Sequence, residues 1–227
     1  MWVPILIVVL VAYLLGSIPS SVWIGKIFYG IDVREHGSGN AGTTNTIRVL
    51  GYKAGIPVFI IDALKGWFAV FLTKIVFGYF PSVEMPEYMS LIAAVAVVIG
   101  HTFPIFFKFK GGKGVATSLG VVLTLDWQVG VIMAVIAIAI MASSRYVSLG
   151  SITAGGLYPF ILFVYLLSKG ENMESNITYI AMSFILAVIL IGKHHSNIKK
   201  LRNGTENKLF AKKAQQEEDI EESEEEV

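Results

Sequence analysis

Residues 36–48 read HGSGNAGTTNTIR, a run of small and hydrogen-bonding residues that ends in an arginine. Its glycines permit positive φ, which lets neighbouring backbone N–H groups converge on one point. The glycines are Gly37, Gly39 and Gly42, and the side-chain donors are Ser38, Asn40, Thr43, Thr44 and Asn45. Arg48 can add a bidentate contact to phosphate. The run therefore predicts an anion site, and an ordinary loop with glycine turns is the alternative.

A second run of the same character, KFKGGKGVAT, covers residues 108–117 and follows directly on a hydrophobic segment. Gly111, Gly112 and Gly114 surround Lys113, so this lysine can present a point charge over a nest of backbone N–H groups. The run matches only the end of a nucleotide-binding P-loop and lacks the full GxxxxGK[ST] pattern. It predicts a second anion site, with lysines that merely fix topology as the alternative.

His194 and Asn197 are three residues apart at the start of a basic segment. A helix would place them on one face, where they could orient or deprotonate a hydroxyl. Polar capping at a membrane interface is the equally weighted alternative, and His195 would point elsewhere. The histidines show no HxxxH or HExxH spacing, so no metal site and no cofactor are predicted.

The composition is that of an integral membrane protein. Of the 227 residues, 54% are hydrophobic and only 15% are charged, against about 25% charged in soluble domains. The net charge of +1 hides an acidic segment at 217–226 and a basic remainder, which favours anionic lipid and phosphate. Nothing predicts a nucleic-acid partner. The absence of cysteine excludes disulfides and thiol catalysis.

The hydrophobic segments predict an all-α bundle of membrane-spanning helices. Five segments have about the length of a membrane crossing, namely Val3 to Ile24, Ala54 to Phe80, Tyr88 to Phe107, Gly150 to Ser168 and Ile177 to Gly192. Residues 115–142 are ambiguous, because Asp126 to Gln128 interrupt them: they form one long helix or two short crossings. The short loops divide cleanly by charge when two crossings are counted. We therefore expect seven transmembrane helices with short or partial central crossings.

With seven crossings and the basic loops on the cytoplasmic side, the N-terminus lies outside and the C-terminus lies in the cytoplasm. This topology also brings four polar segments to the cytoplasmic face, namely residues 36–48, 108–117, 145–151 and 193–208. Since non-helical backbone survives at membrane depth only when it is buried in protein or faces water, the glycine-rich loop at 111–114 should dip into the bundle. The site is expected where these segments meet, at the cytoplasmic boundary.

Asp62 and Lys65 lie three residues apart within a span, where charges are costly unless they are paired. We expect them to pair with one another, and a supporting role under the anion site is the alternative. Residues 1–208 are predicted to form a single membrane-embedded domain. Residues 209–227 are predicted to be a charged, disordered cytoplasmic tail.

Three motifs in order resemble the bacterial acyl-phosphate:glycerol-3-phosphate acyltransferases, the PlsY family. They are GSGNAGTTNTIR, GHTFPIFFKFKGGKGVAT and KHHSNIKKLRNGTENK, and the likeness extends from Leu15 to Lys208. The resemblance implies a seven-helix enzyme of the bacterial cytoplasmic membrane whose active site faces the cytoplasm. Such an enzyme transfers an acyl chain from acyl phosphate to the sn-1 hydroxyl of glycerol 3-phosphate. The products are lysophosphatidate and phosphate, in the first committed step of phospholipid synthesis.

The motifs and this resemblance assign a role to each candidate residue. Expected in catalysis are Ser38, Arg48, Lys113, His194 and Asn197. Expected to bind substrate are Gly37, Gly39, Asn40, Gly42, Thr43, Asn45, Gly111, Gly112, Gly114, Ser148 and Ser151. Either Ser148 or Ser151 fits the serine that the family has after the fifth crossing, and the sequence does not choose between them. Asp62, Lys65 and Glu206 are expected to be structural.

Acyl phosphate is a mixed anhydride whose phosphate leaves readily, so orientation and charge neutralisation can supply most of the catalysis. We expect Lys113 and Arg48 to bind phosphate and Ser38, His194 and Asn197 to position the reacting groups. The proton acceptor is left open between His194 and a phosphate oxygen of a substrate. Direct transfer is favoured over an acyl-enzyme at Ser38, because no GxSxG turn surrounds that serine.

The expected partners are the two substrates, membrane lipid and an upstream enzyme that forms acyl phosphate. A transporter of an organic phosphate is the main alternative function, although alternating access would need binding groups near the midplane of the membrane. A phosphotransferase acting on a nucleotide-linked lipid would need clustered aspartates, and the sequence has none.

Overall fold

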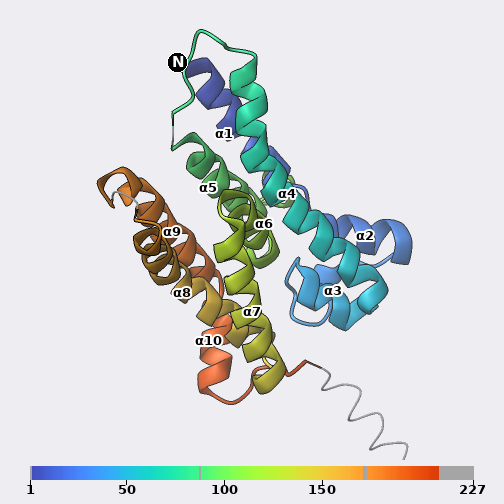
Figure 1. The fold of residues 1–227 in the computed structure, drawn as a ribbon. Coiled ribbons are helices and arrows are strands. Elements are labelled where there is room, and N and C mark those ends of the chain that lie inside the picture. The colour runs from blue at the N-terminus through green and yellow to red at the C-terminus, as the bar shows by residue number, and fades with distance from the viewer. Residues whose placement is uncertain (1, 87, 171–172, 210–227) are drawn as a thin grey trace, which may run out of the picture.

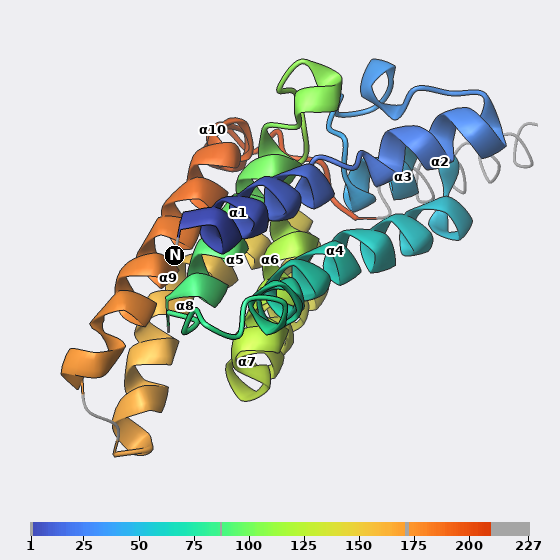
Figure 2. The ribbon, with the colours of Figure 1, turned by 90° about the horizontal axis from the view of Figure 1, so that it is seen from above.

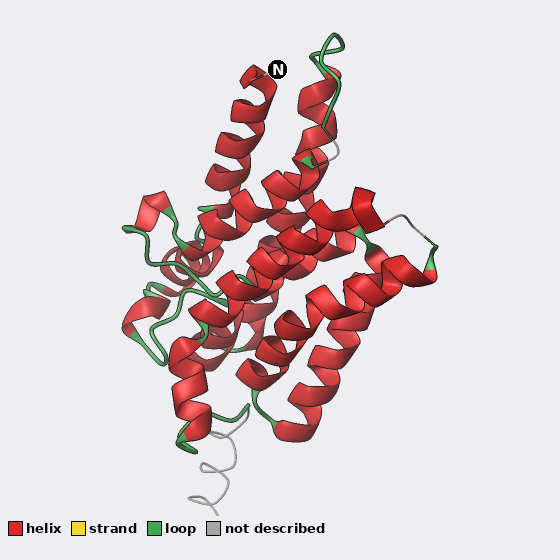
Figure 3. Ribbon diagram, turned by 90° about the vertical axis from the view of Figure 1, so that its left-hand side faces the viewer, coloured by secondary structure: helices red, strands yellow, loops and turns green. Residues whose placement is uncertain are grey.

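The computed structural model describes residues 2–86, 88–170 and 173–209, and every regular element within these ranges is a helix (Figure 3). The α-helices are α1 (Trp2–Gly16), α2 (Ser20–Tyr29), α3 (Thr43–Leu50), α4 (Tyr52–Gly78), α5 (Met89–Thr102), α6 (Val115–Leu125), α7 (Trp127–Ser144), α8 (Val147–Ser168), α9 (Met173–Lys193) and α10 (His195–Arg202). Two short 3-10 turns, Val33–Glu35 and Ile105–Phe107, lie in the connections. The predicted acidic tail lies outside the described residues, except for Leu209.

Five helices of the described part are long and apolar enough to cross a membrane: α4, α5 with the turn that follows it, α7, α8 and α9. Helices α1 and α2 reach that length only as a pair, and they are bent by 40°. Helix α6 has 11 residues and is about 16 Å long, well short of the hydrocarbon core. The prediction of an all-α fold with several apolar helices of membrane-spanning length is confirmed for the described residues, and α6 is the short central helix.

The first span, expected over Val3 to Ile24 with a kink at Pro19, is bent by 40° and divided there into two helices. The helix stops at Gly16 and restarts at Ser20, because Pro19 cannot continue the backbone hydrogen bonds. A lysine from another helix satisfies a carbonyl that the break frees, since Lys65 Nζ donates to Ile18 O at 3.0 Å. The break therefore depends on α4 as well as on its own sequence.

The ambiguous stretch after the second glycine-rich run forms two helices. They meet at Asp126, whose backbone is extended and whose carboxylate accepts from Val129 N at 3.5 Å as the N-cap of α7. Helix α7 has 18 residues, so of these two helices α6 is the one too short to span a membrane by itself.

Two pairs of helices cross closely in the bundle, α1 with α5 and α4 with α6 (Figures 1 and 2). Helix α1 packs on α5 where Gly16 and Gly100 face each other, and α4 packs on α6 through Gly66 and Gly120. A Cβ atom at any of these glycines would collide with a backbone carbonyl of the facing helix. Small residues of this kind allow close approach of helices in lipid. Helix α6 is thereby fixed against α4, with its N-terminus at the level of the polar loops.

The N-terminus and the α4–α5 connection lie at one end of the molecule, and α10 lies at the other (Figure 1). Helices α8 and α9 run side by side, and α7 packs on α8. The loops that carry the three polar motifs therefore meet away from the N-terminus.

Candidate active site

A cavity of about 320 Å³ opens where the polar segments meet. Residues predicted for catalysis, substrate binding or support that line it are Ser38, Asn40, Gly42, Thr43, Asn45, Arg48, Asp62, Lys113, Gly114, Ser148, Ser151, His194, Asn197 and Glu206. They come from the α2–α3 loop, α3, α4, the loop before α6, α8, α10 and the segment after α10. The predicted convergence of four polar segments on one site is confirmed, and the volume suits a small-molecule ligand.

The first motif is half loop and half helix. Gly37 and Gly39 have the positive φ values expected of them, 60° and 70°. Gly42 does not: its backbone is extended, with φ −153°, and it is the N-cap of α3. The expected nest of N–H groups is therefore replaced in part by a helix N-terminus, which has free N–H groups and a positive partial charge. Thr43 Oγ1 at this end is buried and has no hydrogen-bond partner among the described residues.

Asn45 holds the loop that carries Ser38. It is 2% exposed, and its Oδ1 accepts from Ser38 N at 2.7 Å and Ser38 Oγ at 3.0 Å. Its Nδ2 donates to Val33 O at 2.7 Å and to His36 O at 3.1 Å. The amide group of Asn45 has no hydrogen left for a substrate. Asn45 therefore positions Ser38, whose oxygen can still accept a hydrogen bond.

Arg48 lies on α3 and is half-buried at the wall of the cavity. Within the described residues its guanidinium makes no hydrogen bond or ion pair, so its donors are available to a ligand. A planar guanidinium in this state is suited to bidentate contact with phosphate.

A chain of hydrogen bonds holds Lys113 at the cavity. Lys113 Nζ donates to Asn197 Oδ1 at 2.6 Å, and Asn197 Nδ2 donates to Glu206 Oε1 at 2.8 Å. Ser148 Oγ donates to the same carboxylate oxygen at 3.0 Å. Burial lowers the pKa of the Lys113 ammonium, and the Glu206 carboxylate acts in the opposite direction. Asn197 and Glu206 thus fix a partly desolvated cation, which strengthens its attraction for an anion.

This series of hydrogen bonds also distinguishes the two candidate serines. Ser148 belongs to the network through Glu206, whereas Ser151 Oγ donates to Val147 O of its own helix at 2.9 Å. Both serines are buried and line the cavity. Ser148 is therefore the one that is linked to the lysine.

Two glycines of the second motif do not line the cavity. A Cβ atom at Gly111 would collide with His101 O, and one at Gly112 would collide with the His101 ring and lie 2.9 Å from Ala41 O. These glycines let the loop enter the bundle between His101 and the first motif, as the sequence predicted for this loop. Gly114, with φ 83°, does line the cavity and begins α6. A second helix N-terminus therefore faces the cavity beside Lys113.

His194 is 2% exposed and caps α10. Its Nδ1 lies 2.8 Å from Leu190 O, and a carbonyl can only accept, so Nδ1 carries the hydrogen and Nε2 has a free lone pair. Burial lowers the pKa of His194 to about 4. The imidazole is therefore neutral near pH 7, and His195, which is exposed, does not share its position.

We expect this burial to appear in the pH dependence of stability. The pKa of His194 is lowered from 6.5 to about 4 on folding, so the unfolded chain binds more protons between these values. Stability should therefore fall as the pH drops from 6.5 towards 4. Thermal unfolding of the detergent-solubilised protein across this range should show the fall, and His194→Gln should reduce it. An equal pH slope in both proteins would contradict the assignment, and His195→Gln is the matched control.

Asp62 and Lys65 form the expected pair, with Asp62 Oδ1 at 2.8 Å from Lys65 Nζ. The same carboxylate oxygen accepts from Ser20 Oγ at 2.7 Å and lies 3.7 Å from His101 Nδ1. Asp62 and His101 also line the cavity, whereas Lys65 does not. The cluster joins α2, α4 and α5, and its His101 lies against Gly111 and Gly112 of the second glycine-rich run. Asp62 thus both pairs with Lys65 and lines the cavity.

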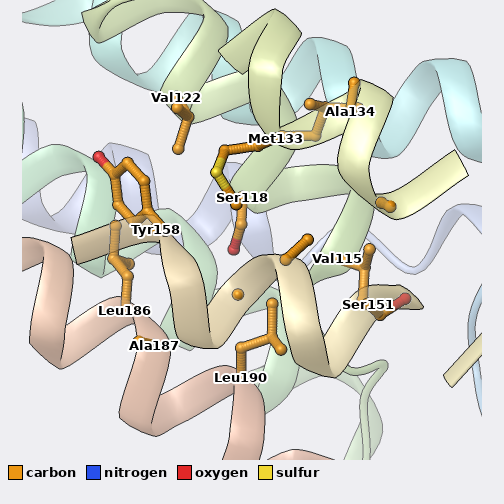
Figure 4. A pocket seen from close by; sticks show the side chains of 14 residues that line it. Val115, Ser118, Val122, Met133, Ala134, Ser151, Tyr158, Leu186, Ala187 and Leu190 are labelled. Atoms are coloured by element: carbon orange, nitrogen blue, oxygen red, sulfur yellow. The ribbon is translucent and has the colours of Figure 1, made fainter. Parts of the chain in front are cut away.

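An apolar cavity of about 100 Å³ adjoins the polar one between α6, α7, α8 and α9 (Figure 4). Val115 and Ser151 line both cavities. The apolar one extends from these two residues towards Tyr158 and Leu186. The site therefore offers a polar cavity suited to anions and an adjoining apolar cavity suited to hydrocarbon.

Sequence reasoning missed several residues of the polar cavity. They are Ile47, Tyr52, Phe59, His101, Val115, Ala116, Met141, Val147, Lys200, Asn207 and Leu209. Lys200 had a usable signal, because it lies three residues after Asn197 and so shares its helix face. Leu209 was assigned to the tail, but its N–H donates to Arg145 O at 2.7 Å. Ile47, His101, Val115, Ala116 and Asn207 lie within the three motifs, but nothing in their residue type or spacing marked them as cavity residues. The remaining four, Tyr52, Phe59, Met141 and Val147, lie outside the motifs, and only the packing of the helices brings them to the cavity.

A model of the glycerol-3-phosphate acyltransferase family matches residues 6–204. The chain belongs to this family. It is 44% identical over 203 residues to a glycerol-3-phosphate acyltransferase of Thermoanaerobacter sp. (strain X514), covering 89% of this chain and 94% of the relative. It is 42% identical over 207 residues to one of Streptococcus pneumoniae serotype 4 (strain ATCC BAA-334 / TIGR4), covering 89% and 92%.

Solved acyltransferase structures have the same fold. The crystal structure of PlsY (YgiH), an integral membrane glycerol 3-phosphate acyltransferase, in its glycerol 3-phosphate form superposes with a TM-score of 0.77 at 37% identity, covering 90% of this chain and 95% of that one. Its lysophosphatidic acid form gives a TM-score of 0.75 at 36% identity, with the same coverage. The resemblance drawn from the three motifs to this acyltransferase family is confirmed.

Proposed function

We propose that this protein transfers an acyl chain from acyl phosphate to the sn-1 hydroxyl of glycerol 3-phosphate. The observation that carries the proposal is the pair of adjoining cavities, one polar at α3 and α6 and one apolar between α6 and α9, which share Val115 and Ser151 in their linings. Two phosphate-bearing substrates need two anion sites, and one of them also needs room for a hydrocarbon chain. Membership of the acyltransferase family agrees with this chemistry.

Two anion sites follow from the two helix N-termini. Arg48, with the free N–H groups at the start of α3, forms one. Lys113, with the start of α6, forms the other. Ser38 is held beside the first site by Asn45. Asn197, expected to position the reacting groups, lines the cavity and accepts a hydrogen bond from Lys113 through its side-chain oxygen.

The reaction needs little acid catalysis, because phosphate is a good leaving group. The hydroxyl oxygen of glycerol 3-phosphate forms a bond to the acyl carbon, and the bond from that carbon to the phosphate oxygen breaks. The hydroxyl proton passes to His194 Nε2 or to a phosphate oxygen. The protein contributes orientation and neutralisation of the phosphate charges, both of which lower the barrier.

The topology that fits this site has seven crossings, with the α1–α2 pair and the short α6 each counted as one. The polar loops then lie on the cytoplasmic face of a bacterial inner membrane and the N-terminus lies outside. Residues 1–208 would form the single membrane-embedded domain, with 209–227 as a cytoplasmic tail. A separate enzyme must supply the acyl phosphate, which the cavity receives through its cytoplasmic side or from the membrane.

The proposal is tested by incubating the purified protein, in a lipidic membrane mimic, with glycerol 3-phosphate and palmitoyl phosphate. Release of phosphate together with lysophosphatidate is expected, and palmitoyl-CoA should not replace the acyl phosphate. Binding of glycerol 3-phosphate without product from either donor would overturn the proposal and favour a transporter.

A further inference from the structure

The hydroxyl of Ser118 on α6 is buried and has no hydrogen-bond partner in the described residues. Hydroxyls inside the helices of this protein ordinarily donate to a carbonyl one turn back. On the same helix Thr124 Oγ1 donates to Gly120 O at 2.7 Å, and on α7 Ser144 Oγ donates to Ile140 O at 2.6 Å. A buried hydroxyl without a partner is costly. The hydroxyl hydrogen of Ser118 is therefore available to a ligand.

Ser118 lines the apolar cavity about one helical turn after Val115, which lines both cavities. Its side chain lines the apolar cavity and points into it between Tyr158 and Val115 (Figure 4). Its Oγ is also close to the polar cavity, because a Cβ atom at Gly114 would lie 3.8 Å from it, and Gly114 lines that cavity. Of the buried hydroxyls without a partner, Ser118 is the one in the described residues that lines the apolar cavity.

The shape of an acyl phosphate places its carbonyl where the two cavities adjoin. The phosphate must lie in the polar cavity and the chain in the apolar one, and the carbonyl group joins the two. Ser151 lines both cavities, but its hydrogen is used in the bond to Val147 O. Among these two serines only Ser118 has a free hydrogen for a carbonyl oxygen.

We propose that Ser118 donates a hydrogen bond to the carbonyl oxygen of the acyl donor and stabilises the negative charge that develops on it. This inference rests on the proposed acyltransferase function. As the glycerol oxygen bonds to the acyl carbon, the carbonyl electron pair moves onto oxygen, and it returns as the bond to phosphate breaks. Ser118 keeps its proton throughout. In a site closed to water such a donor acts without reorganisation.

The test begins with Ser118→Ala. We expect kcat/KM for palmitoyl phosphate to fall roughly 100-fold, as for removal of one oxyanion donor, while the KM for glycerol 3-phosphate stays within about twofold. Thr124→Val is the matched control, because it removes a hydroxyl from the same helix that is already bonded to its own backbone. The control should keep wild-type kinetics.

Hexadecyl phosphate separates a hydrogen bond to the carbonyl from a simple effect on cavity shape, because it has the chain and the phosphate but no carbonyl. Its inhibition constant should be equal for the wild type and Ser118→Ala. A folded Ser118→Ala with wild-type kcat/KM would overturn the inference, as would a loss of hexadecyl phosphate affinity equal to the loss in kcat/KM. In either case an active wild type leaves the acyltransferase proposal standing, whereas an inactive wild type refutes that proposal first.

Discussion

Lys113→Ala should lower kcat/KM for acyl transfer roughly 1,000-fold, because this substitution removes the cation that the structure holds at the second anion site. Its ammonium group is partly desolvated, and the hydrogen bond from Nζ to Asn197 Oδ1 fixes it in one direction. A charge in such surroundings attracts phosphate more strongly than a charge in water. The loss should appear in steady-state rates of phosphate release and in weaker binding of glycerol 3-phosphate.

Lys110→Ala is the matched control for this loss. Lys110 is exposed and precedes Lys113 in the same loop, but it does not line the polar cavity. It should keep near-wild-type rates, which would show that the effect at Lys113 is not a general loss of positive charge at the membrane surface. Retention of more than about a tenth of the activity by Lys113→Ala would contradict the assignment of the phosphate site.

The largest effect on stability is expected from Asp62→Ala. The side chains of Asp62 and Lys65 are 2% and 5% exposed, and their charged atoms are 2.8 Å apart. Removal of the carboxylate would leave the ammonium of Lys65 buried without its counter-charge and would also deprive Ser20 of its acceptor. Breaking a buried pair in this way costs about 3–5 kcal/mol. A lower midpoint of thermal unfolding in detergent measures the effect.

The double variant Asp62→Ala/Lys65→Met checks the cause. Because it removes both charges, it should recover most of the stability lost in the single variant. A double variant as unstable as Asp62→Ala would show that packing at position 62, and not the unpaired lysine, determines the loss. Wild-type stability of Asp62→Ala would refute the role of the pair altogether.

Local spacing predicted the features that depend on one segment. Hydropathy identified the spans, because lipid requires long apolar helices. The i, i+3 spacing identified the Asp62–Lys65 pair, because side chains three residues apart are neighbours on the surface of a helix. The distribution of basic residues among the loops predicted that the glycine-rich runs lie on the same side of the membrane as the basic C-terminal segment, because each crossing takes the chain to the other side.

Features that depend on a neighbouring helix could not be predicted in this way. Pro19 suggested a kink, but the break in the first span is completed by Lys65 from α4. Gly111 and Gly112 look like ligand-binding glycines, yet they are needed because His101 lies against them. Asn45 looks like a ligand for substrate, yet its amide is used by the loop backbone.

By itself the sequence determined that this is a helical membrane protein of an acyltransferase family with a polar site on one face, because apolar length, the distribution of basic residues and motif order are properties of the chain. Only the tertiary structure decided that Ser148 and not Ser151 joins Lys113 through Glu206, and that the Ser118 hydroxyl has no hydrogen-bond partner among the residues the structure describes. A serine has the same identity in the sequence whichever acceptor its hydroxyl bonds to. The folded structure determines that this acceptor is a carbonyl of its own helix at Ser151 and the distant Glu206 carboxylate at Ser148.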